Sequence, residues 1–227
     1  EGDAGTGVEK FQDLTDDNVS AILGPTLSNT AFEAHPVAQD AGVPVVAVSN
    51  TAEGITDTGE YIFRVSLAEA DVIPQTVESV VDEFDPATAA LVFSSDDAWS
   101  ASSADAFRSA ADLHGIEILI EEDVPSDGED FSDAIANIGE ADPDIIILTA
   151  LEHSSIGVVR EAREQGLEQR IVCGNGCNTG TFIEKTGDAS EGLVVGSAWH
   201  VDVENEQSEA FVDKYREEYG EDPDQFS

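Results

Sequence analysis

The chain has 227 residues, with 49 acidic residues against 9 basic ones and a formal net charge of −40 at pH 7. So few cations cannot neutralise the phosphates of a nucleic acid, and anionic lipids would repel this charge, so both would be poor partners. The acids alternate with apolar residues, which make up 41% of the chain, and this indicates a folded domain with an acidic surface. Because salt of about 1 M shortens the Debye length to about 3 Å, the composition suggests a halophilic archaeal protein.

Short apolar runs alternate with helix-like segments along almost the whole chain. We predict strands at 20–24, 43–48, 61–65, 89–93, 116–120, 145–148, 170–173 and 193–197. We predict helices at 8–17, 28–41, 69–84, 101–114, 131–138, 155–165, 181–186 and 206–218, after a structureless lead-in. This alternation is typical of an α/β fold, in which helices flank parallel sheets.

Two longer polar segments, at 65–70 and 198–205, interrupt the alternation between a strand and the following helix. We interpret them as hinge crossings between two Rossmann-like lobes. Residues 67–202 would form lobe 2, and residues 1–66 with 203–227 would form a truncated lobe 1. No apolar run reaches the length of about 18 residues that a spanning helix needs, no signal peptide is visible, and both ends look cut.

The stretch 19–51 is predicted to fold as strand, helix and strand, with polar side chains where each strand ends. Ser28 follows the first strand, and Ser49, Asn50 and Thr51 follow the second. In a parallel sheet these ends lie at one edge, which is where such folds bind ligands. Ser28 is expected to cap its helix, and the N–H groups at that helix start would favour an anion.

Cys173 and Cys177 are the two cysteines of the chain. They are too few for a disulfide scaffold, and their C-x3-C spacing is a weak metal signal without further ligands. They could stay free or form a local disulfide, which an extracytoplasmic setting would permit. Either cysteine could also act as a nucleophile with His153 or His200 as base, but no G-x-S-x-G or dinucleotide motif supports this. We expect no enzyme, cofactor or metal.

Several strings resemble the type I periplasmic binding protein-like family, and most closely the branched-chain amino acid substrate-binding components of ABC transporters. They are GPTLSNTAFEAHPVAQDAGVPVVAVSNT, YIFRVS, ALVFSSDDAW, DFSDAIANIGEADPDIIIL, VVREAREQGL, GDASEGLVVGSAW and FVDKYREEYGEDPDQFS. The resemblance covers essentially the whole chain. It implies a lipid-anchored receptor at the cell surface, monomeric or weakly dimeric, that closes around a small solute and delivers it to an ABC permease. A ligand-sensing domain of a signalling receptor with the same fold is the alternative.

The resemblance also implies where a ligand would bind. Its carboxylate would lie on lobe 1, held by Ser28 and by Ser49, Asn50 and Thr51 at the next strand end. Trp99, at the tip of a polar loop, would cover the ligand from lobe 2.

Two further positions of lobe 2 bear on the identity of the ligand. Asn175 stands where the family often has an acid that pairs with the ammonium group of the ligand. An amide carries no charge and is a weaker partner for a cation. The ligand would then be a carboxylate without an amine, an amide or an aromatic acid, unless Glu152 supplies the missing charge. His153 beside it is either an exposed loop residue or a second wall residue.

Overall fold

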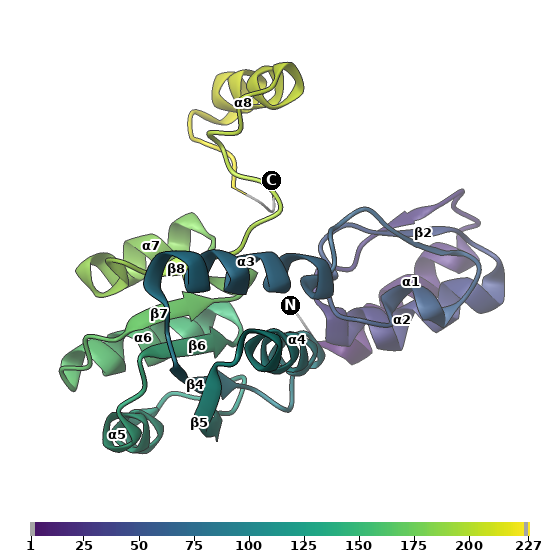
Figure 1. Ribbon diagram of the computed structural model, residues 1–227. Helices are drawn as coiled ribbons and strands as arrows, with labels where there is room; N and C mark the ends of the chain where they lie inside the picture. The colour runs from purple at the N-terminus through teal and green to yellow at the C-terminus, as the bar shows by residue number, and fades with distance from the viewer. Residues whose placement is uncertain (1–2, 225–226) are drawn as a thin grey trace.

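The computed structural model describes residues 3–224 and 227 and contains two parallel β-sheets (Figure 1). The smaller sheet has the strand order β1-β2-β3 and the larger β5-β4-β6-β7-β8. All neighbouring strands are parallel, so the predicted α/β fold with parallel sheets is confirmed. From here, lobe 1 denotes the smaller sheet with its helices and lobe 2 the larger sheet with its helices.

The elements follow the predicted alternation. The strands are β1 (Ile22–Leu23), β2 (Val45–Ala47), β3 (Ile62–Arg64), β4 (Thr88–Phe93), β5 (Glu117–Asp123), β6 (Ile145–Thr149), β7 (Arg170–Cys173) and β8 (Val194–Val195). The α-helices are α1 (Ala4–Asp16), α2 (Ser28–Ala41), α3 (Glu69–Phe84), α4 (Ala98–His114), α5 (Ser132–Ala141), α6 (Glu152–Glu164), α7 (Gly180–Thr186) and α8 (Glu206–Tyr219).

The central strands of the lobe 2 sheet, β4, β6 and β7, are buried on both faces, because helices cover each face (Figure 1). Along β6, Ile146 and Leu148 belong to the core formed with α5, α6 and α7. Ile145 and Ile147 belong to the core formed with α3 and α4. This double burial explains why these strands read as continuous apolar runs rather than as alternating patterns.

The sheet of lobe 1 is covered on one face by α1 and α2. Its core consists of Phe11, Ile22, Ala34, Ala38, Val45 and Ile62. On the other face Leu23 and Val65 are 75% and 72% exposed. Gly7 lets α1 lie close to α2, because a Cβ at this position would stand 2.3 Å from Thr30 Cγ2.

Side-chain caps set the helix starts that the sequence placed too late. Helix α1 begins at Ala4, inside the predicted lead-in, because the Asp3 carboxylate accepts a hydrogen bond of 2.7 Å from Thr6 N. Helix α4 begins at Ala98 because Asp97 accepts one of 2.8 Å from Ser100 N. Such caps stabilise the first turn.

Three other expectations about helix ends are corrected by the structure. Helix α6 begins at Glu152, three residues before the predicted start, and α5 spans Ser132–Ala141 rather than 131–138. Helix α2 has the predicted bounds, but its N-cap is Leu27, so Ser28 is its first residue rather than its cap. Gly42 ends α2 with a left-handed φ of 68°, as expected.

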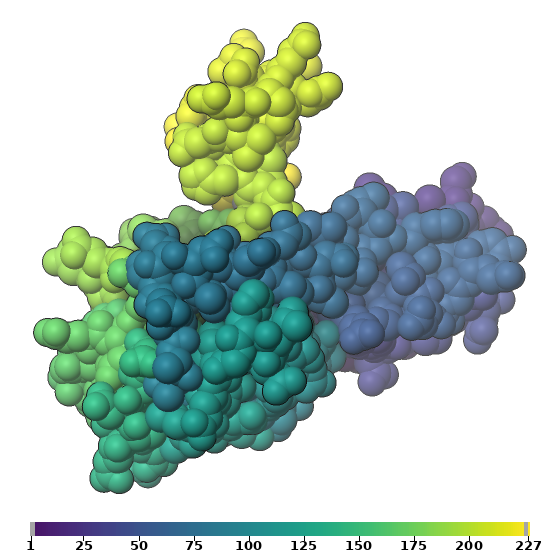
Figure 2. Space-filling view, in the orientation of Figure 1, coloured from purple at the N-terminus to yellow at the C-terminus, as the bar shows by residue number. Residues whose placement is uncertain are grey.

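Helix α8 projects from the rest of the molecule (Figures 1 and 2). At its base the Trp199 ring lies 5.9 Å from the Phe211 ring, and Trp199 Nε1 donates to Ser208 Oγ at 3.0 Å. The residue ranges of the two lobes and the hinge crossings at 65–70 and 198–205 stay predictions, and residues 1–2 and 225–226 of predicted lobe 1 lie outside the described part. Within that part, the helices lack the length and apolar character needed to cross a membrane.

Candidate ligand-binding site

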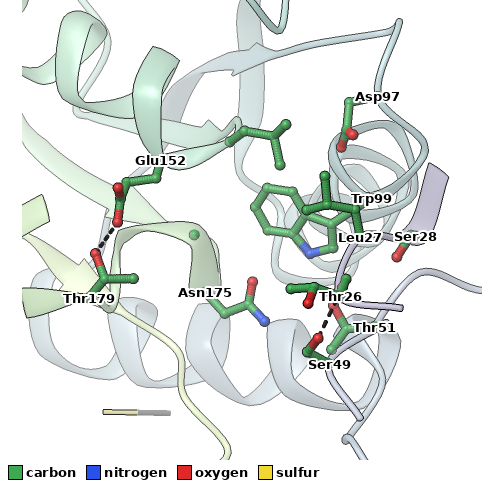
Figure 3. A pocket seen from close by; sticks show the side chains of 12 residues that line it. Thr26, Leu27, Ser28, Ser49, Thr51, Asp97, Trp99, Glu152, Asn175 and Thr179 are labelled. Carbon is green, nitrogen blue, oxygen red and sulfur yellow. Dashed lines mark hydrogen bonds between the residues drawn. The ribbon is translucent and has the colours of Figure 1, made fainter. Parts of the chain in front are cut away.

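A cavity of about 300 Å³ lies between the two lobes (Figure 3). Such a volume suits a small ligand. It is lined by Thr26, Leu27, Ser28, Ser49 and Thr51 of lobe 1 and by Asp97, Trp99, Leu151, Glu152, Asn175, Gly176 and Thr179 of lobe 2. Six of the seven predicted site residues are therefore brought together here.

The seventh predicted residue, Asn50, lies behind the cavity wall. Its side chain is fully buried, and its Nδ2 donates to Thr26 O at 3.0 Å. Its Oδ1 has no hydrogen-bond partner among the described residues. The amide therefore holds the loop that carries Thr26 and does not line the cavity.

The start of α2 faces the cavity without a side-chain cap. Its N-cap, Leu27, has no side-chain group that could accept from the first N–H groups, and Ser28 follows as a buried first residue. The first N–H groups of a helix have no partner within the helix and carry partial positive charge. This end of the cavity can therefore hold an anion, such as the carboxylate of a ligand.

The hydroxyls of Ser49 and Thr51 are already committed as donors. Ser49 Oγ donates to Thr26 O at 2.9 Å, and Thr51 Oγ1 donates to Glu69 Oε1 at 3.2 Å. A hydroxyl has one hydrogen and two lone pairs. In this arrangement both side chains offer acceptor sites to the cavity, whereas the sequence suggested that they would donate to a carboxylate.

Trp99 lies in the first turn of α4, not at a loop tip as expected. It lines the cavity yet is only 7% exposed. Its ring packs on Gly174 and Gly176, where an added Cβ would lie 3.3 Å and 3.0 Å from ring carbons. A Cβ at Gly176 would also lie 2.9 Å from Ala150 O. The glycines beside Asn175 are thus explained by the close approach of the tryptophan.

Glu69, the first residue of α3, was not identified from the sequence. It is 3% exposed and accepts hydrogen bonds from Trp99 Nε1 at 3.0 Å and Thr51 Oγ1 at 3.2 Å. Burial raises the pKa of its carboxyl, and these two hydrogen bonds act in the opposite direction. An acid in the first turn of a helix is ordinary, so nothing in the sequence signals that this one is buried.

The remaining polar groups of lobe 2 are acidic or neutral. Glu152 accepts a hydrogen bond from Thr179 Oγ1, which itself accepts from Phe182 N at 3.0 Å. Asp97 is buried, and burial raises the pKa of its carboxyl. Among the described residues no basic side chain lines the cavity, and His153 is exposed on a separate surface. The cavity therefore favours a ligand with a cationic or hydrogen-bond-donating group.

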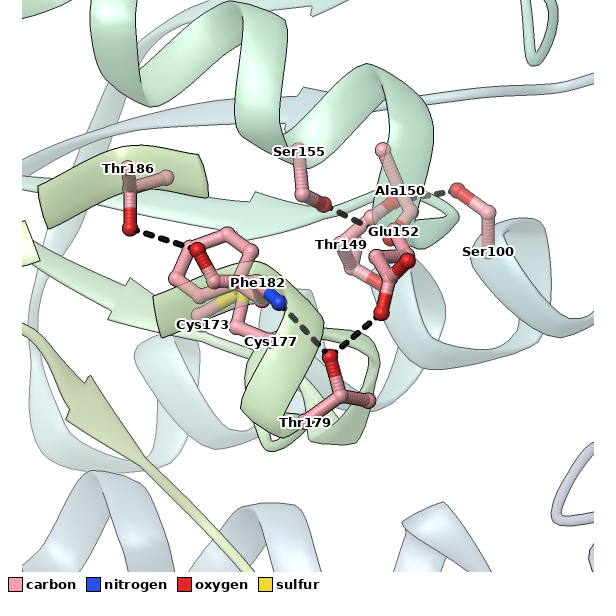
Figure 4. Close-up of a disulfide and its surroundings, with 10 residues drawn as sticks. All are labelled: Ser100, Thr149, Ala150, Glu152, Ser155, Cys173, Cys177, Thr179, Phe182 and Thr186. Atoms are coloured by element: carbon pink, nitrogen blue, oxygen red, sulfur yellow. Dashed lines mark hydrogen bonds between the residues drawn. A yellow bond between two sulfur atoms is a disulfide. The ribbon is translucent and has the colours of Figure 1, made fainter. Parts of the chain in front are cut away.

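A disulfide joins Cys173 and Cys177 (Figure 4). Of the alternatives left open by the sequence, the structure therefore has the local disulfide and not the free pair. Both cysteines are fully buried, and the loop they close carries Asn175 and Gly176. In Figure 3, Asn175 projects into the cavity from one side and Ser49 from the other.

Asn29 and Glu53 of lobe 1 form hydrogen bonds with lobe 2 beside the cavity. Asn29 Oδ1, on α2, accepts from Ala98 N at 2.7 Å. The N–H of Glu53 donates to Ser102 Oγ of α4 at 2.9 Å. These polar residues resemble ordinary surface positions in the sequence, and only the approach of the lobes gives them partners.

The sequence matches the family described as periplasmic binding protein over residues 1–227. It is 25% identical over 223 residues to Leu/Ile/Val-binding protein homolog 7 of Brucella abortus, covering 91% of this chain and 55% of that protein. The chain thus spans about half the length of the curated relatives it matches.

Solved structures match almost the whole chain. The branched-chain amino acid transporter substrate-binding protein of Streptococcus pneumoniae in complex with isoleucine has a TM-score of 0.91 and 25% identity, over 99% of this chain and 65% of that one. A solute-binding protein of an ABC transporter from Rhodopseudomonas palustris, in complex with 3,4-dihydroxybenzoic acid, has a TM-score of 0.86 and 22% identity, over 98% and 62%. The expected type I periplasmic binding protein fold is confirmed.

Proposed function

The chain belongs to the periplasmic binding protein family, and from that premise we propose that it captures a small carboxylate-bearing solute for an ABC importer. The observation that carries the proposal is the cavity between the lobes, with an uncapped helix start on lobe 1 and an aromatic ring on lobe 2. Closure of two lobes around a ligand is a known mode of domain movement. The solved relatives named above are substrate-binding or solute-binding proteins.

A branched-chain amino acid fits the polarity of the cavity. The start of α2 with Ser28 would hold the carboxylate. The acceptor sites of Ser49 and Thr51, and the charge of Glu152, would face the ammonium group. Leu151 and Trp99 would contact the apolar side chain. The isoleucine in a solved relative supports this choice.

An aromatic acid is the second candidate, and two observations favour it. Asn175 is uncharged, and the flat ring of Trp99 forms a wall of the cavity. A solved relative holds an aromatic carboxylate. Of the two candidates, only the amino acid carries a cation for Glu152.

Thermal shift and calorimetry in molar KCl test both candidates. We expect leucine, isoleucine and valine to raise Tm, whereas 4-methylpentanoate, which is leucine without its amine, should not. Ser28→Ala should weaken leucine binding about tenfold, and Ser20→Ala, at an exposed position outside the cavity, should not. If neither these amino acids nor 3,4-dihydroxybenzoate binds the wild-type protein at millimolar concentration, the proposed function is wrong.

The setting is also part of the proposal. We propose an extracytoplasmic protein at the cell surface, with a lipid anchor and an ABC permease as partner. The family supports the location, and so does the disulfide, because cytosolic thiols are normally kept reduced.

A further inference from the structure

Glu69 lies where the two lobes meet. Its backbone N–H donates to Thr51 O at 3.1 Å, and this hydrogen bond joins the start of α3 to the loop that follows β2. Its Oε1 accepts from Thr51 Oγ1 of lobe 1 and from Trp99 Nε1 of lobe 2. One carboxylate oxygen therefore joins two cavity residues from opposite lobes.

The hydrogen bond from Trp99 restricts the position of the ring. The indole N–H is a donor only, so a buried tryptophan needs an acceptor at this one atom. Glu69 supplies that acceptor, while Gly174 and Gly176 allow the benzene part of the ring to pack on the neighbouring loop. With both parts held, the ring presents a fixed surface to the cavity.

The hydrogen bond from Thr51 fixes the orientation of its hydroxyl. Because its single hydrogen points to Glu69, the lone pairs of Oγ1 remain for a donor in the cavity. The same carboxylate thus decides what both residues present to a ligand.

Packing alone does not account for a buried acid at this position, because transferring a carboxylate out of water has an unfavourable free energy. The start of α3 offsets part of this cost through its partial positive charge. An apolar residue of similar size would fill the space without the cost, but it would leave the Trp99 N–H without an acceptor.

We propose that Glu69 is a positioning residue that fixes the Trp99 ring and the Thr51 hydroxyl at the ligand-binding surface, and so couples the two lobes of the site. Its effect on ligand affinity rests on the proposed function. Its effect on Trp99 does not, because that contact joins two side chains of the protein itself.

The indole N–H signals give a direct test. The chain has two tryptophans, so a ¹H–¹⁵N spectrum shows two indole peaks, and Trp199→Phe assigns them. In Glu69→Gln the Trp99 peak should move upfield, because a neutral acceptor makes a weaker hydrogen bond. In Glu69→Leu its hydrogen exchange should accelerate at least tenfold. Glu78→Leu, at an exposed acid on the same helix, is the matched control and should leave the peak unchanged.

Leucine and 3,4-dihydroxybenzoate are the probes for affinity. For the probe that binds the wild type, Glu69→Leu should lower the affinity at least tenfold. Glu69→Gln, which keeps an acceptor oxygen, should lower it at most threefold. Trp99→Phe should weaken it too, and the double variant Glu69→Leu/Trp99→Phe should be no weaker than the poorer single variant, because both changes remove one interaction.

An unchanged Trp99 peak in both Glu69 variants, or losses of affinity that add in the double variant, would overturn the proposal. If Glu69→Leu does not fold, the Glu69→Gln peak decides the question. If neither probe binds the wild-type protein, the proposed function fails, and the indole spectra still test Glu69 independently.

Discussion

The polar groups around the cavity fall into two sets, those that can only accept a hydrogen bond from a ligand and those that can still donate one. Ser49 and Thr51 give their hydroxyl hydrogens to protein acceptors, so they are left to accept. The first turn of α2 is left to donate, because Leu27 cannot cap it. A ligand that carries both an acid and a hydrogen-bond donor matches both sets of groups, and a zwitterion is the simplest such ligand.

The position of Asn175 allows this ligand assignment to be tested by adding a charge. Asn175→Asp would place a carboxylate in a cavity wall that already contains Asp97 and Glu152. We expect leucine to bind about tenfold more tightly, because a charged acceptor makes stronger hydrogen bonds with an ammonium group. Binding of 3,4-dihydroxybenzoate should weaken through repulsion. Titration calorimetry measures both, and equal changes for the two probes would contradict an ammonium contact at this wall. Asn178→Asp, outside the cavity lining, is the control.

The titration of Glu69 should be visible in stability. Burial raises the pKa of its carboxyl above the ordinary value of 4.5, so the folded state holds this proton more tightly than the unfolded chain. Its contribution to stability is therefore complete below about pH 4.5 and is lost as pH rises through the folded pKa. Glu69→Gln removes this loss. From about pH 4 to about pH 7, the Tm of Glu69→Gln measured by calorimetry should rise relative to that of the wild type. Asp97 is present in both proteins, so its contribution to the pH dependence cancels in the difference between their Tm values. A constant difference would show that Glu69 titrates normally.

At the scale of elements, hydrophobic periodicity predicted the fold because it is a local property. The apolar run 145–148 identifies a strand buried on both faces whatever its neighbours are. Helix starts were predicted less well, since Asp97 before α4 could equally be a loop residue until its hydrogen bond to Ser100 N is seen. That shift moved Trp99 from a loop into a helix. The burial of Glu69 and the role of Asn29 depend on contacts between lobes, which no local pattern contains.

The loop between Cys173 and Cys177 is the element that the disulfide restrains. For so short a loop, the chain-entropy relation gives a stabilisation of about 2 kcal/mol. The double variant Cys173→Ala/Cys177→Ala should unfold at lower denaturant concentration and should bind leucine more weakly, because Asn175 and Gly176 lie within the loop. Titration of the denatured wild type without reductant should find no free thiol. Two thiols per chain would contradict the bond. Leu113→Ala, on α4 at a position that is 76% exposed and outside this loop, is a control for the stability measurement.

Hydrogen bonds join the two lobes of the molecule. Asn29 with Ala98 and Glu53 with Ser102 join them beside the cavity, and Glu69 joins them beneath it. Hydrogen bonds of this kind can be exchanged for water as the lobes separate, at a modest net cost. A ligand that contacts both lobes would then add the free energy that favours closure.

Charge acts on the molecule as a whole. Glu69 and Asp97 are the buried acids among the described residues, so nearly all of the 49 acids lie at least partly in solvent with only 9 basic residues to offset them. The ion pairs found in the described part are on the surface, such as Arg108 with Glu121, and such pairs contribute little. Net repulsion should therefore oppose folding at low salt and disappear as salt screens it.

We propose, as the composition suggests, that the protein is built for high salt, and expect its Tm to rise with KCl. Most of the rise should occur below about 1 M, where the Debye length has already fallen to about 3 Å. The variant Glu209→Gln/Glu217→Gln/Glu218→Gln removes three exposed charges from α8 and should gain less from salt than the wild type, because less repulsion remains to be screened. Calorimetry from 0.1 to 3 M KCl measures both curves. A Tm that falls with salt, or parallel curves for the two proteins, would mean that surface repulsion does not limit stability.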